Sequence, residues 1–127
     1  MSEDSNNIED LRNRTNDLVV SVLRSLGDVK ACPAGATLVQ EAVISAGQTQ
    51  LFFRRACNVK SKEEFHERLP MVQEAAERTA YWLNLIAETE MIPHAKTDTP
   101  LALARETMSA LTAAKVTRKL RSKRSSR

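Results

Sequence analysis

Residues that interrupt helices are scarce in this sequence, which has three glycines and four prolines among 127 residues. Alanine, leucine, glutamate and arginine are plentiful instead, and such a composition favours helices. Cysteine is also rare, because only Cys32 and Cys57 occur and they are not closely spaced. We therefore expect a cytoplasmic protein in which both thiols are reduced.

Long apolar runs and common catalytic motifs are missing as well. No N-terminal segment resembles a signal peptide, and no stretch is long and apolar enough to cross a membrane, so we expect no membrane association. The sequence has no glycine-rich phosphate loop and no nucleophile motif. We therefore expect a protein that is not an enzyme and that needs no cofactor. Its length suggests a single domain with a real core.

Apolar residues recur at steps of three and four in four separate segments, and no segment resembles a strand. The segments cover residues 8–26, 39–56, 65–86 and 101–111. Four helices with short linkers predict an all-α fold, an up-and-down four-helix bundle. The average step of about 3.5 residues predicts a left-handed twist of the helices.

The charge pattern adds boundaries to this bundle. The last ten residues hold six of the nineteen lysines and arginines and none of the sixteen acidic residues. The protein is thus a mildly acidic body with a basic end. We expect a flexible N-terminus, a bundle and a basic flexible tail, at residues 1–6, 7–117 and 118–127.

Several residues mark the expected ends of helices. Gly27 ends the first segment, and Ser61 is a good N-cap for the third, with Glu64 completing a capping box. Thr99 is expected to cap the fourth helix, with Pro100 in its first turn.

Pro70 lies inside the third segment, where it removes a backbone donor and crowds the previous turn. A proline in a regular helix costs about 3 kcal/mol, so we expect a kink near residues 66–69. The alternative is a separate short helix that ends at Leu69.

Some apolar residues fall outside the core pattern. If Phe53 faces the core, Leu51 lies roughly on the opposite side of the helix, and Ile44 points the same way. In the third segment, Tyr81 and Leu85 also point away from the core. Isolated exposed apolar residues are common. However, two adjacent helices share this feature, so we favour a subunit interface formed by these four residues.

Metal and thiol sites find little support. Glu63 and His66 form a Glu-x-x-His motif, but a di-iron bundle needs two such motifs and two further glutamates. His66 follows the core residue Phe65, so we interpret it as an unliganded surface histidine. His94 lies in a loop without a partner at ligand spacing. A metal-bundle oxidase remains a distant alternative, and Cys57 is interpreted as a small buried hydrophobe.

Basic residues gather in two places, residues 54–62 and the tail. The first group can be explained by favourable charge at a helix C-terminus, although that explanation suits one or two cations better than four. The tail has too few apolar residues to offset its ordering entropy, so we expect it to be frayed or disordered. The ten residues predicted to contact nucleic acid are Arg54, Arg55, Lys60, Lys62, Arg118, Lys119, Arg121, Lys123, Arg124 and Arg127.

The stretch SKEEFHERLPMVQEAAERTAYWLNLIAE, with the end of the segment before it, resembles a four-helix-bundle family. Its members are encoded by intervening sequences in bacterial large-subunit ribosomal RNA genes, and they include Avd, the accessory variability determinant of diversity-generating retroelements. The basic C-terminus also looks like Avd. The matching residues are Arg54, Ala56, Cys57, Ser61, Lys62, Glu64, Phe65, Thr79, Tyr81, Trp82, Leu83 and Leu85.

This chain departs from the family at Phe52 and Arg55, where members often have Asn and Glu, and at Pro70. The resemblance implies a homopentamer of bundles around a central channel. For Avd it further implies a non-enzymatic partner of a reverse transcriptase that also contacts nucleic acid.

Two functions therefore remain open. The first is an oligomeric accessory or scaffold protein that binds RNA or DNA through charge. The second is a protein-interaction module without a nucleic-acid role, in which the tail only improves solubility.

Overall fold

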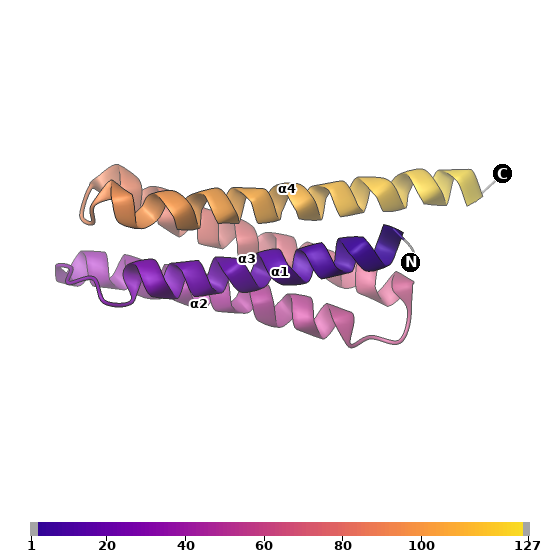
Figure 1. Ribbon diagram of the computed structural model, residues 1–127, viewed down its shortest axis with the longest axis horizontal. Helices are drawn as coiled ribbons and strands as arrows, with labels where there is room; N and C mark the ends of the chain where they lie inside the picture. Colours follow the sequence, from indigo (N-terminus) through magenta and orange to yellow (C-terminus); the bar gives the residue numbers. More distant parts are fainter. Residues whose placement is uncertain (1–2, 126–127) are drawn as a thin grey trace.

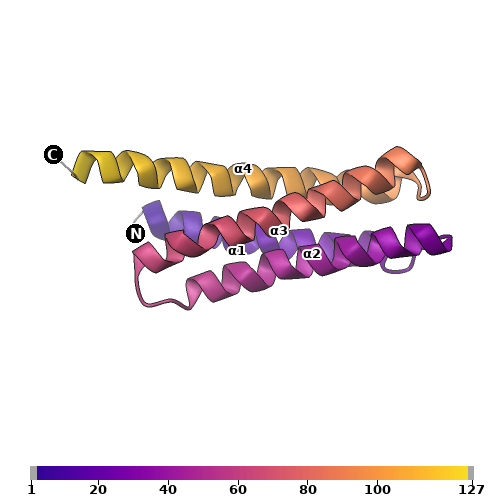
Figure 2. The same ribbon diagram turned by 180° about the vertical axis from the view of Figure 1, so that it is seen from behind.

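The computed structural model describes residues 3–125, with side chains described for residues 7–114. Four helices make up the fold: α1 (Glu3–Leu26), α2 (Pro33–Cys57), α3 (Lys62–Thr89) and α4 (His94–Ser125). Each helix runs antiparallel to the next, and α4 closes the ring by packing on α1 (Figures 1 and 2). No strand occurs within residues 3–125. The predicted all-α, up-and-down four-helix bundle is confirmed, whereas its left-handed twist stays a prediction.

Local chemistry accounts for most helix ends. α1 ends before Gly27, whose N–H donates to the Leu23 carbonyl at 2.9 Å. A Cβ at position 27 would collide with that carbonyl oxygen, so glycine is required there. Ser61 caps α3 by accepting the N–H of Glu64 at 3.1 Å, as the sequence predicts. Glu90 ends α3 in the left-handed conformation, with φ 53°.

The fourth helix begins earlier than the sequence predicts. α4 starts at His94, so Thr99 is an interior residue rather than the cap, and Pro100 lies beyond the first turn. Thr97 and Pro100 are both buried, and the Thr97 hydroxyl donates to the His94 carbonyl at 3.2 Å. Burial of these two residues packs the first turns of α4 against the core. The apolar pattern of residues 101–111 does not include them, so it does not predict this packing.

Pro70 does not divide the third helix. α3 runs without a break from Lys62 to Thr89, so the alternative of a separate helix ending at Leu69 is wrong. Pro70 is exposed while Leu69 is fully buried. The proline therefore faces solvent, and burial of the neighbouring core residues keeps the helix continuous despite the missing donor. The predicted kink stays a prediction.

The apolar core consists of two clusters, one near each end of the bundle. The first contains Leu18, Val22, Leu26, Ala42, Ala46, Ala80, Leu83, Ile86, Ile92 and Ala104. The second contains Leu11, Phe53, Ala56, Phe65, Leu69, Val72, Ala76 and Leu111. The second cluster includes the two phenylalanine rings, which meet edge to face at 6.1 Å between centroids.

A layer of buried threonines lies between the two clusters, one from each helix. We call Thr15, Thr49, Thr79 and Thr107 the threonine layer. The hydroxyl oxygens of Thr49 and Thr79 lie 3.4 Å apart, so α2 and α3 meet at this level. Each hydroxyl donates to a carbonyl of its own helix, which satisfies a buried donor. The four acceptors are the carbonyls of Arg12, Ser45, Ala75 and Leu103, at 3.1, 2.8, 2.8 and 2.7 Å.

The C-terminal segment continues α4 beyond the predicted boundary of the bundle. The helix extends to Ser125 and projects past the other three helices in Figure 1. The side chains of residues 115–127 lie outside those that the structure describes. The predicted flexibility of residues 1–6 and 118–127 in solution stays a prediction.

Candidate nucleic-acid interface

The basic residues around the α2–α3 connection are all exposed. Arg54 and Arg55 lie in the last turn of α2, Lys60 lies in the connection, and Lys62 is the first residue of α3. We call these four residues the basic cluster. Arg54 and Arg55 suit their place in the last turn, because cations are favourable near a helix C-terminus.

The topology brings this cluster and the end of the chain to the same end of the bundle. α2 and α4 both run towards the end at which α1 begins, so the α2–α3 connection and the C-terminus lie on one side (Figure 1). Six predicted contacts, from Arg118 to Arg127, fall in the segment whose side chains are not described. Five of them, from Arg118 to Arg124, belong to α4, which extends from the same end as the basic cluster, and Arg127 lies outside the described residues.

Acidic residues at this end are partly engaged already. The Arg12 guanidinium pairs with Glu9 at 2.8 Å, and Arg14 pairs with Asp10 at 2.9 Å. Both pairs lie within one turn of α1. The four cations of the basic cluster are exposed on α2, on α3 and in the connection between them.

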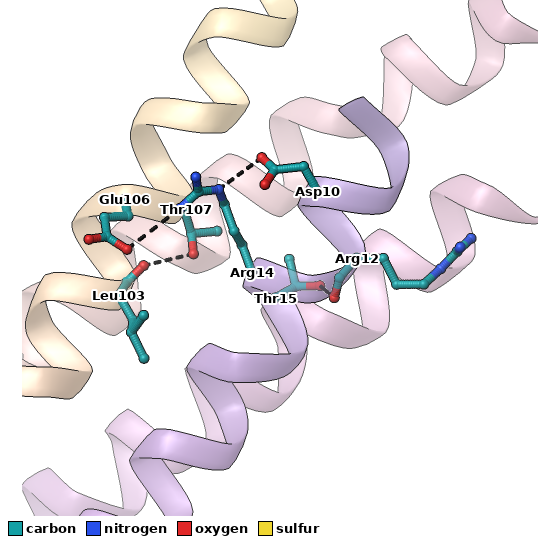
Figure 3. A network of polar contacts seen from close by, with 7 residues as sticks. All are labelled: Asp10, Arg12, Arg14, Thr15, Leu103, Glu106 and Thr107. Carbon is teal, nitrogen blue, oxygen red and sulfur yellow. Dashed lines mark hydrogen bonds and ion pairs between the residues drawn. The ribbon is translucent and has the colours of Figure 1, made fainter. Parts of the chain in front are cut away.

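Arg14 has a structural role between α1 and α4. Its Nε bonds Asp10, and its Nη1 lies 3.5 Å from a carboxylate oxygen of Glu106 on α4 (Figure 3). The hydrogen bond to Asp10 is the main cause that raises the pKa of Arg14 above its ordinary value. Arg14 is thus bound on two sides, and we do not count it among the contacts for a ligand.

Sequence reasoning missed a cleft between α1 and α2 that is lined by both polar and apolar groups. The cleft has a volume of about 400 Å³ and contains two arginines, Arg12 and Arg54. Its lining is formed by Arg12, Asn13, Thr15, Asn16, Gln50, Phe53 and Arg54. The available signal was the run of polar residues on one flank of α1, at positions 12, 13 and 16.

The two cysteines are free and differ in environment. Cys32 is exposed at the N-cap of α2, whereas Cys57 is half-buried at the end of that helix. Burial raises the pKa of the Cys57 thiol, and the nearby Arg12 guanidinium opposes this only in part. The Cys57 thiol is therefore protonated at neutral pH and a poor nucleophile.

His66 is not the open surface residue that the sequence predicts. It is half-buried, and its ring meets Phe65 edge to face at 5.3 Å between centroids. His66 is partly buried because it lies beside the core residues of α3, three residues before the buried Leu69. Within the described part of the chain, no three His, Cys, Asp or Glu side chains converge to hold a metal ion.

The apolar residues outside the core lie on the outer side of α2 and α3. Ile44, Leu51 and Tyr81 are 45%, 44% and 58% exposed, and Leu85 is half-buried. Met71, which the sequence analysis missed, is also exposed. Its position ten residues before Tyr81 continues the same helical stripe. We call these five residues the outer face.

A polar contact fixes how the two helices of this face align. The Arg78 guanidinium donates to the Gln48 side-chain oxygen at 3.1 Å, and the threonine pair of the layer lies beside it. In this antiparallel register Ile44 is about level with residues 81–85. Leu51 is level with the turn that follows Met71. The register brings residues of both helices to similar levels on this side, and a contiguous surface formed by all five stays a prediction.

None of the described helices combines the length and the apolar character that a membrane-spanning helix requires.

Comparisons with known proteins support the fold. No protein-family model matches the sequence, and no similar protein was found among curated ones. A similar solved structure is the crystal structure of a protein of unknown function from the S23 ribosomal protein family of Bacteroides thetaiotaomicron, with a TM-score of 0.68. The alignment has 16% sequence identity and covers 85% of this chain and 96% of that one. The chain therefore shares the fold of a small helical protein of that family, and the comparison contains no evidence for a relation to Avd.

Proposed function

We propose that this protein is a non-enzymatic, oligomeric scaffold or accessory protein that binds RNA or DNA through charge. The observation that carries the proposal is the gathering of cations at one end of the bundle. The exposed basic cluster lies there, and the helix that carries five of the six further basic residues leaves from the same end. Phosphates that meet these cations release counterions, and this release favours binding without sequence specificity.

Self-association is the second part of the proposal. An apolar surface formed by two packed helices is a common site of contact with another subunit. The outer face has this character, and Gln48 and Arg78 at its centre can add hydrogen bonds to a contact. Several basic ends in one assembly would strengthen weak phosphate contacts through avidity. The resemblance to the Avd family further suggests a pentamer and a reverse transcriptase as partner.

The rival function is a protein-interaction module that does not bind nucleic acid. The outer face favours it, because an exposed apolar surface also suits an unrelated protein partner. Under this alternative the basic C-terminal segment only keeps the protein soluble.

A binding experiment distinguishes the two functions. Fluorescence anisotropy with labelled structured RNA and with duplex DNA is measured for the full chain and for a variant that lacks residues 118–127. We expect the full chain to bind both, and the shortened chain to bind more weakly with unchanged oligomeric state and thermal stability. Charge reversal at Arg54 and Arg55 is expected to weaken binding further. If the full chain does not bind in low salt, the interaction module is the better description.

A further inference from the structure

The register between α1 and α2 brings two arginines to the same level. The side-chain amide of Gln50 on α2 donates to the Asn16 side-chain oxygen on α1 at 2.9 Å. The helices run antiparallel, so the next turn of each places Arg12 opposite Arg54. Both arginines line the cleft of about 400 Å³ between these helices.

Two guanidinium groups that face one cleft repel each other, and an anion between them removes this repulsion. Glu9 is the acidic partner of Arg12, at 2.8 Å. Both members of this pair are largely exposed, and an exposed ion pair contributes little to stability because water screens it. It therefore competes only weakly with a ligand that both arginines can bind. Figure 3 shows Arg12 leaving α1 on the side opposite Arg14 and its acidic partners.

The other side chains of the cleft suit an oxyanion with polar groups attached to it. Asn13, Asn16 and Gln50 carry amides that can donate to oxygen atoms or bind sugar and base edges. The planar guanidinium fork of arginine matches the geometry of phosphate oxygens. The volume also lies within the usual range for ligand sites, about 300–1,000 Å³.

From this juxtaposition we propose that the α1–α2 cleft is a phosphate-binding site, in which Arg12 and Arg54 hold one phosphodiester of a nucleic-acid strand between them. This inference rests on the proposed nucleic-acid binding, and it adds a defined site on the body of the bundle. Arg55 lies in the last turn of α2 and Lys60 in the connection that follows, and both are exposed, so a strand can continue from the cleft to the rest of the basic cluster.

The outer face adjoins the cleft along α2. Leu51 precedes Arg54 by three residues, so the two side chains lie about 60° apart around the helix. A strand bound in the cleft would therefore lie beside a subunit contact made through Leu51.

The test is a double-mutant cycle on the full chain with a labelled short single-stranded RNA. The variants are Arg12→Gln, Arg54→Gln and their combination, with Arg24→Gln at the other end of α1 as the charge-matched control. Each single variant is expected to weaken binding roughly three- to tenfold, and the control to change it little. Because both arginines hold one phosphate, the double variant should lose no more affinity than the single variant that binds RNA more weakly. Circular dichroism and thermal melting confirm that each variant is folded.

The salt dependence gives a second readout. If the arginines share one phosphate, the magnitude of the slope of log K against log salt should fall by about 0.7 in the double variant. If they contact two phosphates independently, it should fall by about 1.4. Arg54→Lys keeps the charge but loses the fork, so we expect weaker binding than in the wild type.

Three outcomes would overturn the proposal. Additive losses in the double variant, or wild-type binding by Arg54→Lys, would mean general attraction by charge, while the proposed function would stand. Saturable binding of a free nucleoside monophosphate without RNA binding would assign the cleft to a small molecule. Absence of any RNA binding by the full chain would remove both this site and the proposed function.

Discussion

Two leucines separated by one residue on α3 provide a sharp test of the core and the outer face. Leu83 is fully buried in the first apolar cluster, whereas Leu85 is half-buried on the outer face. Leu83→Ala removes three buried carbon atoms, which costs about 2.4 kcal/mol at about 0.8 kcal/mol each. The cavity that remains adds a further cost, so we expect a loss of about 2–5 kcal/mol. Leu85→Ala leaves no closed cavity and removes about half as much buried surface, so we expect about 1 kcal/mol.

The assay is urea unfolding followed by circular dichroism, with thermal melting as a second measurement. For a chain of this size each 1 kcal/mol lowers Tm by roughly 3–5 °C, so Leu83→Ala should melt roughly 6–25 °C below the wild type. Both are measured at several protein concentrations, because an oligomer adds concentration-dependent stability. If the two variants lost equal free energy of unfolding, or if Leu85→Ala lost more in the monomer, the assignment of Leu83 to the core of α3 would be refuted.

Two further predictions concern the outer face and the thiols. Leu51→Glu should shift the protein towards monomer in light scattering, because a charge would enter an apolar contact. Its helical circular dichroism should stay nearly unchanged, because Leu51 is outside the core. A monomeric wild type would contradict the interface. Iodoacetamide should modify Cys32 much faster than Cys57 near pH 7, as measured by mass spectrometry, because burial raises the pKa of Cys57 and lowers its thiolate fraction. Alkylation of Cys57 should speed up as the pH rises, and equal rates at neutral pH would contradict this account.

The fold was largely predictable because apolar periodicity and helix ends agree along this chain. Thr15, Thr49 and Thr79 lie within the predicted segments, each three or four residues from apolar core residues on both sides, and all three are buried. The Ser61 cap was also predicted. These features are local, so spacing and residue type are enough to find them.

The start of α4 was not predictable in the same way. Thr99 and Pro100 are a good signal for a helix start, but burial of Thr97 and Pro100 extends the helix to His94. The continuity of α3 through Pro70 has the same kind of cause. In both places, packing in the folded bundle overrides a local preference.

The candidate site was also predictable only in part. The exposed basic cluster follows from residue type and from its place at the end of a helix. The α1–α2 cleft does not, because Arg12 and Arg54 are far apart in sequence. They come together only through the register that the contact of Gln50 with Asn16 reports. A single helix pattern contains no information on such a register.

The central claim is that this bundle binds nucleic acid through charge. Its most direct test is the affinity of the full chain for structured RNA, measured by anisotropy at several salt concentrations from low to physiological. Counterion release predicts measurable binding in low salt and a log K that falls linearly and steeply with log salt. No binding in low salt, or an affinity that does not change with salt, would contradict the claim.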